Sequence, residues 1–192
     1  MILEILSDWR LKEFEEHRKL KKEGDIEVTD LIRCPLKRYF EERYPELHKA
    51  SVYTPATILG SLVHLGLEKI LSEELNAEIE VKGEKKLGEH KIVGRIDAKL
   101  GKVGIEIKTS RGDFEIPYEH HVLQVKIYNW LFDLEKSVLV YVTPDRVTEF
   151  IVEEKAKEEE IIKLIVDKTS PRYDWECRYC FFSILCPNKK RK

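Results

Sequence analysis

The sequence predicts an α/β fold in which helices flank a mixed sheet and the two ends of the chain meet outside that core. Long helical patterns flank short strand patterns along the chain, and 192 residues are enough for one domain with a substantial core. We expect a single domain over residues 1–192, with its core at about residues 52–155 and a second region formed by about residues 25–45 and 170–192.

Composition limits the classes of function. With 42% hydrophobic and 36% charged residues, the chain is expected to be soluble and globular with a highly charged surface. The net charge of −2 gives no overall basic signature, so a nucleic acid would have to bind a local patch. No apolar run approaches the roughly 20 residues of a membrane span, and the N-terminus lacks the apolar stretch of a secretory signal. We therefore expect a cytoplasmic protein without membrane contact, and its bias toward Lys and Glu is typical of hyperthermophiles.

The first half of the chain is predicted to be mainly helical. Its elements, in order, are a charged helix from Ser7 to Glu23 ended by Gly24, an extended segment from Asp25 to Val28, a helix from Asp30 to about Tyr44 capped by Thr29 and ended near Pro45, and a long helix over residues 55–75 that Thr54 and Pro55 open. The buried side of the long helix is predicted to consist of Leu59, Leu62, Val63, Leu67, Ile70 and Leu71.

The second half alternates strands with helices. The predicted elements are a strand from Ala77 to Val81, a hairpin within Gly94–Ser110, a helix from Tyr118 to Phe132, strands at Ser137–Thr143 and Thr148–Val152, a helix from Glu153 to Val166, and a cysteine-containing tail from Ser170.

The hairpin is the first candidate for a site. Gly101 and Lys102 are typical of a two-residue II′ turn, which pairs Leu100 with Val103. Counting outward sets Asp97 opposite Glu106, with their Cβ atoms about 4.5–5.5 Å apart. One face of the first strand is then apolar, consisting of Ile92, Gly94, Ile96, Ala98 and Leu100.

Two interpretations of the charged face stay open at this point. Two carboxylates with Lys108 two residues further along could hold a divalent metal and a water beside a phosphate. A half-exposed antiparallel sheet also carries ordinary charge pairs on its solvated face, and this hairpin alone does not exclude that arrangement.

Four cysteines, Cys34, Cys177, Cys180 and Cys186, form a second candidate site. The last three are spaced C-x2-C-x5-C, and both Cys34 and Cys186 are followed by proline. Three clustered thiolates with one distant thiolate favour an iron–sulfur cluster of the 4Fe–4S type. A zinc site, disulfides and unrelated buried thiols are the alternatives.

Two helix motifs are uninformative when taken singly. His64 lies among leucines in the long helix, where a histidine is commonly a packed core residue. Gln124, the only glutamine, and Tyr128 stand at i and i+4 and so share one helical face.

Together these segments resemble a known family. GSLVHLGLE (residues 60–68), GRID (94–97), EIK (106–108) and QVKIY (124–128) are similar to the ordered motifs of the PD-(D/E)XK nucleases of the RecB type. The added cysteine pattern narrows the resemblance to the CRISPR-associated RecB-like exonucleases, the Cas four family, over nearly the whole chain. The resemblance implies a restriction-endonuclease-like core of a mixed sheet flanked by helices, with an iron–sulfur-stapled helical region at the two ends.

The resemblance also implies roles for individual residues. His64, Asp97, Glu106 and the backbone carbonyl of Ile107 would ligate Mg²⁺ or Mn²⁺. Lys108 would orient the attacking water, and Gln124 and Tyr128 would line the same cleft as catalytic residues.

The implied activity is exonucleolytic hydrolysis of single-stranded DNA or of DNA with single-stranded ends. CRISPR spacer-integration proteins are the implied partners. A RecB-like DNA-repair nuclease and a non-catalytic iron–sulfur DNA-binding subunit are the alternatives. The basic tail from Lys189 to Lys192 could contact phosphates or be solvated, and five aromatic residues could stack on bases or shield the cysteines: Tyr173, Trp175, Tyr179, Phe181 and Phe182.

Overall fold

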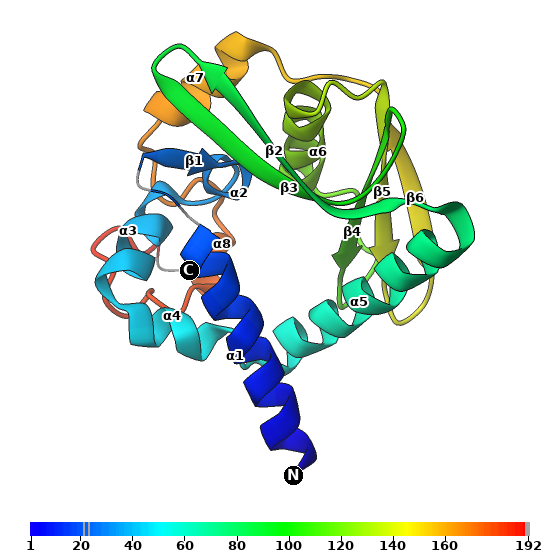
Figure 1. The fold of residues 1–192 in the computed structure, drawn as a ribbon. Helices are drawn as coiled ribbons and strands as arrows, with labels where there is room; N and C mark the ends of the chain where they lie inside the picture. The colour runs from blue at the N-terminus through cyan, green and yellow to red at the C-terminus, as the bar shows by residue number, and fades with distance from the viewer. Residues whose placement is uncertain (21, 23, 191–192) are drawn as a thin grey trace.

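The protein is built on a six-stranded mixed sheet with helices packed on both faces (Figure 1). The structure is a computed structural model that describes residues 1–20, 22 and 24–190. Its elements are α1 (Ile2–Leu20), β1 (Asp25–Glu27), α2 (Val28–Leu31), α3 (Pro35–Arg43), α4 (Pro45–Ser51), α5 (Pro55–Leu75), β2 (Glu78–Leu87), β3 (His90–Leu100), β4 (Val103–Thr109), α6 (Glu119–Leu131), β5 (Lys136–Val142), β6 (Val147–Val152), α7 (Glu158–Val166) and α8 (Glu176–Tyr179).

Strand β3 organises the sheet because it pairs with three other strands. Strand β2 runs antiparallel to it along one edge, while β1, parallel, and β4, antiparallel, share the other edge at opposite ends. Strand β4 pairs in parallel with β5, and β5 pairs antiparallel with β6. Parallel neighbours need a crossover connection, which α6 supplies between β4 and β5.

Apolar side chains fill both faces of the sheet. On one face, α5 contributes Val63, Leu67 and Leu71, which pack against Ala98, Ile105 and Ile107 of the hairpin. On the other face, the buried core contains Ile127 and Leu131 of α6 together with Ile92 and Ile96 of β3. The α/β architecture with a mixed sheet between helices, predicted from the sequence, is therefore confirmed.

The hairpin between β3 and β4 has the predicted turn but an unexpected bend. Gly101 has a φ of 60°, and Leu100 pairs with Val103 as predicted. The recorded pairing ends at Ala98 and Ile105, so the prediction that Asp97 lies directly opposite Glu106 in the ladder is wrong.

The bend also changes which side chains share a face. Ile96 packs into the core beside α6, whereas Ala98 packs beside α5, although the sequence predicted both on one face. The cause lies between them, because the carboxylate of Asp97 accepts the backbone N–H of Ile107 at 2.7 Å. Regular pairing is also interrupted on the β2 side, where Glu80 has a φ of 54°.

Prolines explain most differences in helix boundaries. The predicted helix from Asp30 to Tyr44 is divided into α2 and α3, because Pro35 disfavours a helical conformation at Cys34, whose ψ is 121°. Pro45 begins α4 instead of following the end of a helix. Helix α1 begins before the predicted Ser7, and the predicted end at Glu23 lies outside the described residues. Helix α7 begins at Glu158 rather than Glu153.

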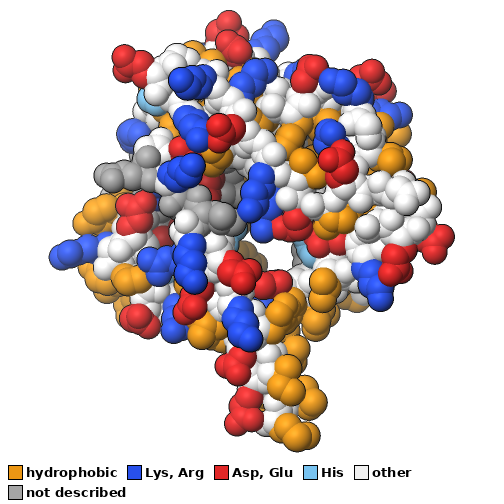
Figure 2. All heavy atoms as spheres, in the orientation of Figure 1, with side chains coloured by type: hydrophobic (Ala, Val, Ile, Leu, Met, Phe, Trp, Pro, Cys, Tyr) orange, Lys and Arg blue, Asp and Glu red, His pale blue; other side chains and the backbone are white. Residues whose placement is uncertain are grey.

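Helices α1 and α5 expose apolar side chains. Leu59, Leu62 and Ile70 of α5, predicted to be buried, are 61%, 42% and 54% exposed, because the sheet covers only the stripe that includes Val63 and Leu67. The N-terminal half of α1 projects from the body of the molecule and carries hydrophobic side chains (Figures 1 and 2). In the part of the chain that the structure describes, no single helix has the length and apolarity of a membrane span, although α4 and α5, bent by 65°, reach them together.

Candidate active site

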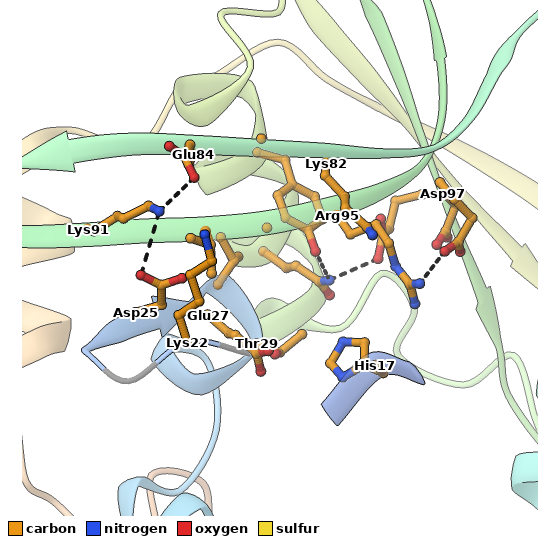
Figure 3. Close-up of a pocket in the computed structure, with 18 of the residues that line it drawn as sticks. His17, Lys22, Asp25, Glu27, Thr29, Lys82, Glu84, Lys91, Arg95 and Asp97 are labelled. Atoms are coloured by element: carbon orange, nitrogen blue, oxygen red, sulfur yellow. Dashed lines mark hydrogen bonds and ion pairs between the residues drawn. The ribbon is translucent and has the colours of Figure 1, made fainter. Parts of the chain in front are cut away.

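A cleft of about 510 Å³ opens beside the bend in β3. Its walls come from α5, the sheet and α6, together with the segment that follows α1 (Figure 3). In Figure 3, Lys91 of β3 lies between the two neighbouring strands, since its Nζ lies 2.7 Å from Glu84 of β2 and 3.7 Å from Asp25 of β1. All six side chains that the resemblance implied line this one cleft: His64, Asp97, Glu106, Lys108, Gln124 and Tyr128.

Glu106 of β4 is held by two donors on the same oxygen. Lys108 Nζ donates to Oε1 at 2.7 Å, and Gln124 Nε2 donates to Oε1 at 2.9 Å. Gln124 also donates to the hydroxyl of Tyr128 at 3.1 Å, as their i, i+4 spacing allows. The second oxygen of Glu106, Oε2, is buried and has no hydrogen-bond partner. Since a buried unpaired acceptor costs about 1–3 kcal/mol, this oxygen is suited to a cation.

Asp97 and His64 meet at the bend from different elements. The Oδ2 atom of Asp97, which accepts the Ile107 N–H, lies 3.5 Å from His64 Nδ1. Helix α5 can bring His64 there because its apolar stripe packs across β3 and β4. His64 is thus directed to a carboxylate rather than enclosed among leucines.

Glu68 is a site residue that the sequence prediction did not include. It stands one helical turn after His64, and its Oε1 lies 3.8 Å from His64 Nδ1. The residue is only 9% exposed, and Oε1 has no hydrogen-bond partner. The available signal was the i, i+4 spacing of His64 and Glu68 on a helix that faces two further carboxylates.

The pKa values of these groups are shifted first by burial and then by the charges of neighbouring groups. Burial raises the pKa of Glu106 to about 7, and the charge of Asp97 adds to the effect. Burial also raises the pKa of Glu68 to about 7, with the charges of Glu80 and Asp97 adding to it. Burial lowers the pKa of His64, but the hydrogen bond with Asp97 and the negative charges of Asp97 and Glu106 together outweigh it, so the pKa is raised. All three shifts indicate a site that attracts positive charge.

The donor atoms fit a hard divalent cation. Nδ1 of His64 and carboxylate oxygens of Glu68 and Asp97 lie within 4.8 Å of one another. An octahedral ion with ligands at about 2.1 Å sets neighbouring donors about 3 Å apart and opposite donors about 4.2 Å apart. Oxygen donors with one imidazole suit Mg²⁺ or Mn²⁺. The predicted ligands Glu106 and the Ile107 carbonyl are not part of this group, and their role stays a prediction.

The fold brings Cys34 to the C-terminal segment. Its backbone N–H donates to Glu176 at 2.6 Å, and its Sγ lies 3.0 Å from the hydroxyl of Ser170. Burial raises the pKa of the Cys180 thiol, and the nearby Cys34 and Cys186 act in the same direction.

The four cysteines, Cys177 included, are free thiols that are not gathered into a compact ligand set. Thiolates on one zinc ion would lie about 3.8 Å apart, whereas no three of these sulfur atoms come within 4.8 Å of one another. A single zinc ion therefore does not fit this arrangement. A 4Fe–4S cluster is larger and holds its thiolates farther apart, and it stays a prediction.

The rest of the C-terminal segment has mixed environments. Phe182 is buried and stacks on Phe40 of α3, with ring centroids 5.8 Å apart, so it is a packing residue. In the basic tail, Lys190 forms an ion pair with Asp174. Arg191 and Lys192 of that tail lie outside the described residues.

Comparison with solved structures defines the class to which this fold belongs. An alkaline exonuclease from Laribacter hongkongensis covers 74% of this chain and is itself 86% covered, with a TM-score of 0.53 at 12% identity. A phage-related exonuclease from Haemophilus somnus 129PT covers 84% and is 95% covered, with a TM-score of 0.50 at 13% identity. The fold is thus that of the PD-(D/E)XK-like exonucleases.

The particular family follows from a much stronger similarity. The CRISPR-associated exonuclease Cas4 of Saccharolobus solfataricus is 45% identical over 98% of this chain and 99% of its own length. The crystal structure of SSO0001, also 45% identical, covers 100% of this chain and is 98% covered, with a TM-score of 0.94. No family model matches the chain. The chain belongs to the Cas4 family of CRISPR-associated exonucleases, which confirms the predicted family.

Proposed function

We propose that this protein is a metal-dependent deoxyribonuclease that hydrolyses phosphodiester bonds from single-stranded DNA ends. The observation that carries the proposal is the convergence of His64, Asp97, Glu106 and Lys108 on one cleft, where Oε2 of Glu106 is buried without a hydrogen-bond partner. Membership of the Cas4 family supports exonuclease activity, since the relative from S. solfataricus is named for it.

Each residue has a role in this mechanism. His64, Asp97 and Glu106, with the carbonyl of Ile107, would hold Mg²⁺ or Mn²⁺, which would lower the pKa of a bound water and neutralise the scissile phosphate. Lys108 orients the water and stabilises the charge that gathers on the phosphate oxygens. Gln124 fixes the carboxylate of Glu106 and the hydroxyl of Tyr128, so the site keeps one geometry as DNA enters.

The experiment is cleavage of end-labelled single-stranded DNA with Mn²⁺ by the wild type and by Lys108→Ala. Lys102→Ala, which removes an exposed lysine from the turn of the same hairpin, is the matched control. We expect the wild type and the control to produce a ladder and Lys108→Ala to produce none. If all three proteins leave the DNA intact, the protein is a non-catalytic DNA-binding subunit and the proposal is wrong.

The biological role that we propose is the trimming of DNA before its insertion into a CRISPR array, with spacer-integration proteins as partners. The support for this role is membership of the Cas4 family. Co-elution of the purified chain with the spacer-integration proteins of its own host would support it. A genome without a CRISPR locus would favour a repair nuclease instead.

We further propose that Cys34, Cys177, Cys180 and Cys186 hold a 4Fe–4S cluster, which would link the two ends of the chain. The contacts of Cys34 with Glu176 and Ser170 support this assignment, because they bring the distant thiol to the segment that carries the other three. Iron analysis and the visible absorbance of anaerobically purified protein test it. Zinc in place of iron would contradict it.

A further inference from the structure

A group of aromatic rings joins the start of α6 to the C-terminal segment. The ring of His120 lies 4.9 Å from that of Trp175 and 5.6 Å from that of Tyr173, measured between centroids. Tyr173 and Trp175 stack on each other at 5.8 Å with an interplanar angle of 13°. Tyr118 stacks on His120 from the other direction, at 5.8 Å and 14°. These distances are typical of favourable aromatic pairs.

The ring group is connected to the cleft through α6, although none of its four residues lines the cleft. His120 precedes Gln124 by four residues, so it lies one helical turn, about 5.4 Å, from the side chain that holds Glu106. The hydroxyl of Tyr118 lies 3.3 Å from that of Ser110, two residues after Lys108. The start of α6 therefore connects the rings with the end of β4 that carries Lys108.

The side chain of Trp175 is held in place by neighbouring rings and is also exposed to solvent. It is 44% exposed even though Tyr173 and His120 pack against it. Tyr179 is 65% exposed but contacts only the guanidinium of Arg178 among the interactions of its ring. Phe182, by contrast, is fully buried. Phe181 is 42% exposed, but no ring packs against it within the described residues. Trp175 therefore differs from Tyr179 and Phe181 because neighbouring rings hold its exposed face in place.

The ring group is also uncharged under ordinary conditions. Burial lowers the pKa of His120 to about 4, and the charge of Lys108 lowers it further. The influence of Lys108 is a second sign that His120 lies near the cleft. A neutral imidazole packs against indole and phenol rings without the cost of a buried charge.

We propose that Trp175, held in place by Tyr173 and His120, is a stacking platform for an unpaired nucleobase of the strand whose phosphate lies at Lys108. This inference rests on the proposed function. Stacking on an aromatic ring does not depend on base identity, so the platform favours single strands without selecting a sequence. Paired bases inside a duplex present no free face, so the same ring discriminates against double-stranded DNA.

Binding without divalent metal separates this role from cleavage. The probe is a fluorescent twelve-nucleotide oligothymidylate, whose affinity is measured by anisotropy in EDTA. We expect Trp175→Ala to weaken binding about tenfold, equivalent to about 1.4 kcal/mol, which is within the range for one stacked base. Trp175→Phe retains most of the affinity because it keeps a ring. Tyr179→Ala, which removes an exposed aromatic residue from the same segment, binds as the wild type does.

A series of oligonucleotides, each with one abasic site, identifies the stacked base. We expect the wild type to lose affinity at one position and Trp175→Ala to show no further loss there. Unchanged affinity in Trp175→Ala overturns the inference. The inference is also overturned if Trp175→Ala loses affinity equally for every oligonucleotide and the variant protein has a lowered melting temperature, because this result indicates a structural role. If Trp175→Ala fails to fold, the affinities for the abasic oligonucleotides are compared between the wild type and Trp175→Phe. An equal affinity for all positions of the abasic site then overturns the inference.

The outcomes also separate this inference from the proposed function. A wild type that degrades single-stranded DNA while Trp175→Ala binds normally contradicts the stacking platform alone. A wild type that neither binds nor degrades single-stranded DNA contradicts the proposed function itself.

Discussion

At the scale of single residues, the carboxylates of the cleft differ in whether their oxygens have partners. Asp97 uses Oδ2 to accept a backbone N–H, and Glu106 uses Oε1 to accept from Lys108 and Gln124. Glu68 Oε1 and Glu106 Oε2 are buried without any donor. Each unpaired buried acceptor is a cost to folding. Glu68 does not line the cleft itself, but its Oε1 lies beside His64 and Asp97, where a divalent cation would remove that cost.

We therefore predict that Glu68→Gln weakens Mn²⁺ binding by about ten- to hundredfold, the range seen when groups that support a metal site are removed. The amide keeps the shape of the side chain and removes its charge. Calorimetric titration with Mn²⁺ measures the effect independently of cleavage. Glu74→Gln, an exposed glutamate on the same helix, is the matched control. Wild-type affinity in Glu68→Gln would show that Glu68 is not a ligand.

The candidate site could be predicted from the sequence only as far as its motifs reach. Asp97, Glu106 and Lys108 lie on one hairpin, so strand alternation alone indicated their proximity. His64 and Gln124 lie on helices that face opposite sides of the sheet, and only the resemblance to a family connected them with the hairpin. Glu68 was missed because it can be recognised as a possible metal ligand only once the fold places Asp97 beside Glu68 and His64.

At the scale of elements, the site depends on how closely β3 approaches α6. A Cβ atom at Gly94 would lie 2.8 Å from Tyr128 and 2.9 Å from Leu131, so a glycine is required there for packing. This close approach brings the face of α6 that carries Gln124 and Tyr128 onto the hairpin.

We predict that Gly94→Ala lowers the free energy of unfolding by about 1–3 kcal/mol through overpacking. It should also reduce cleavage, because Tyr128 must move and Gln124 is bonded to it. Denaturant unfolding and the cleavage assay measure the two effects. Gly66→Ala is the control, since its Cβ would meet nothing within 4 Å and α5 should gain about 0.5–1 kcal/mol. Equal stability of Gly94→Ala and the wild type would refute the packing argument.

Turns and helix ends could be predicted from the sequence where they depend on residues that are adjacent in the chain. The Gly101 turn and the cap at Thr54 depend on neighbouring residues, and both are present in the structure. The bend at Asp97 was not predictable, because it depends on a side-chain hydrogen bond to the neighbouring strand. The exposed side of α5 was also missed, since an apolar pattern does not show how wide a surface the sheet will cover.

At the scale of the whole molecule, stability should depend on pH through His121. Its Nδ1 lies 2.7 Å from the hydroxyl of Tyr141, and burial lowers its pKa to about 2, with Lys108 and His120 adding to the effect. In the unfolded chain the pKa is about 6.5. As the pH falls below about 6.5, the unfolded state binds a proton that the folded state excludes, so the free energy of unfolding decreases.

We predict that His121→Asn flattens this acid dependence. Each excluded proton contributes a slope of at most about 1.4 kcal/mol per pH unit, and Asn keeps a polar group near Tyr141. Urea unfolding between pH 7 and pH 4 measures the difference between variant and wild type. Parallel curves for the two proteins would mean that His121 is protonated in the folded state.

Polar contacts join the two ends of the chain in the folded molecule. Arg172 donates to the carbonyl of Arg33 at 3.2 Å, and Glu176 accepts the N–H of Cys34. These bonds close a loop of more than a hundred residues, and the entropy released on opening such a loop favours separation of the ends. A cluster bound by Cys34 and the C-terminal cysteines would oppose that separation directly.

We predict that Cys180→Ala lowers the free energy of unfolding by on the order of 4 kcal/mol, as a cross-link over about 100 residues does, while cleavage per folded molecule changes much less. Cys34→Ala should have a similar effect, and the double variant should be no less stable than either single variant, because one lost ligand already opens the same closure. Calorimetry with iron analysis tests all three proteins. Additive losses, or a wild-type melting temperature in Cys180→Ala, would mean that the cysteines act separately and that the ends are held by their polar contacts alone.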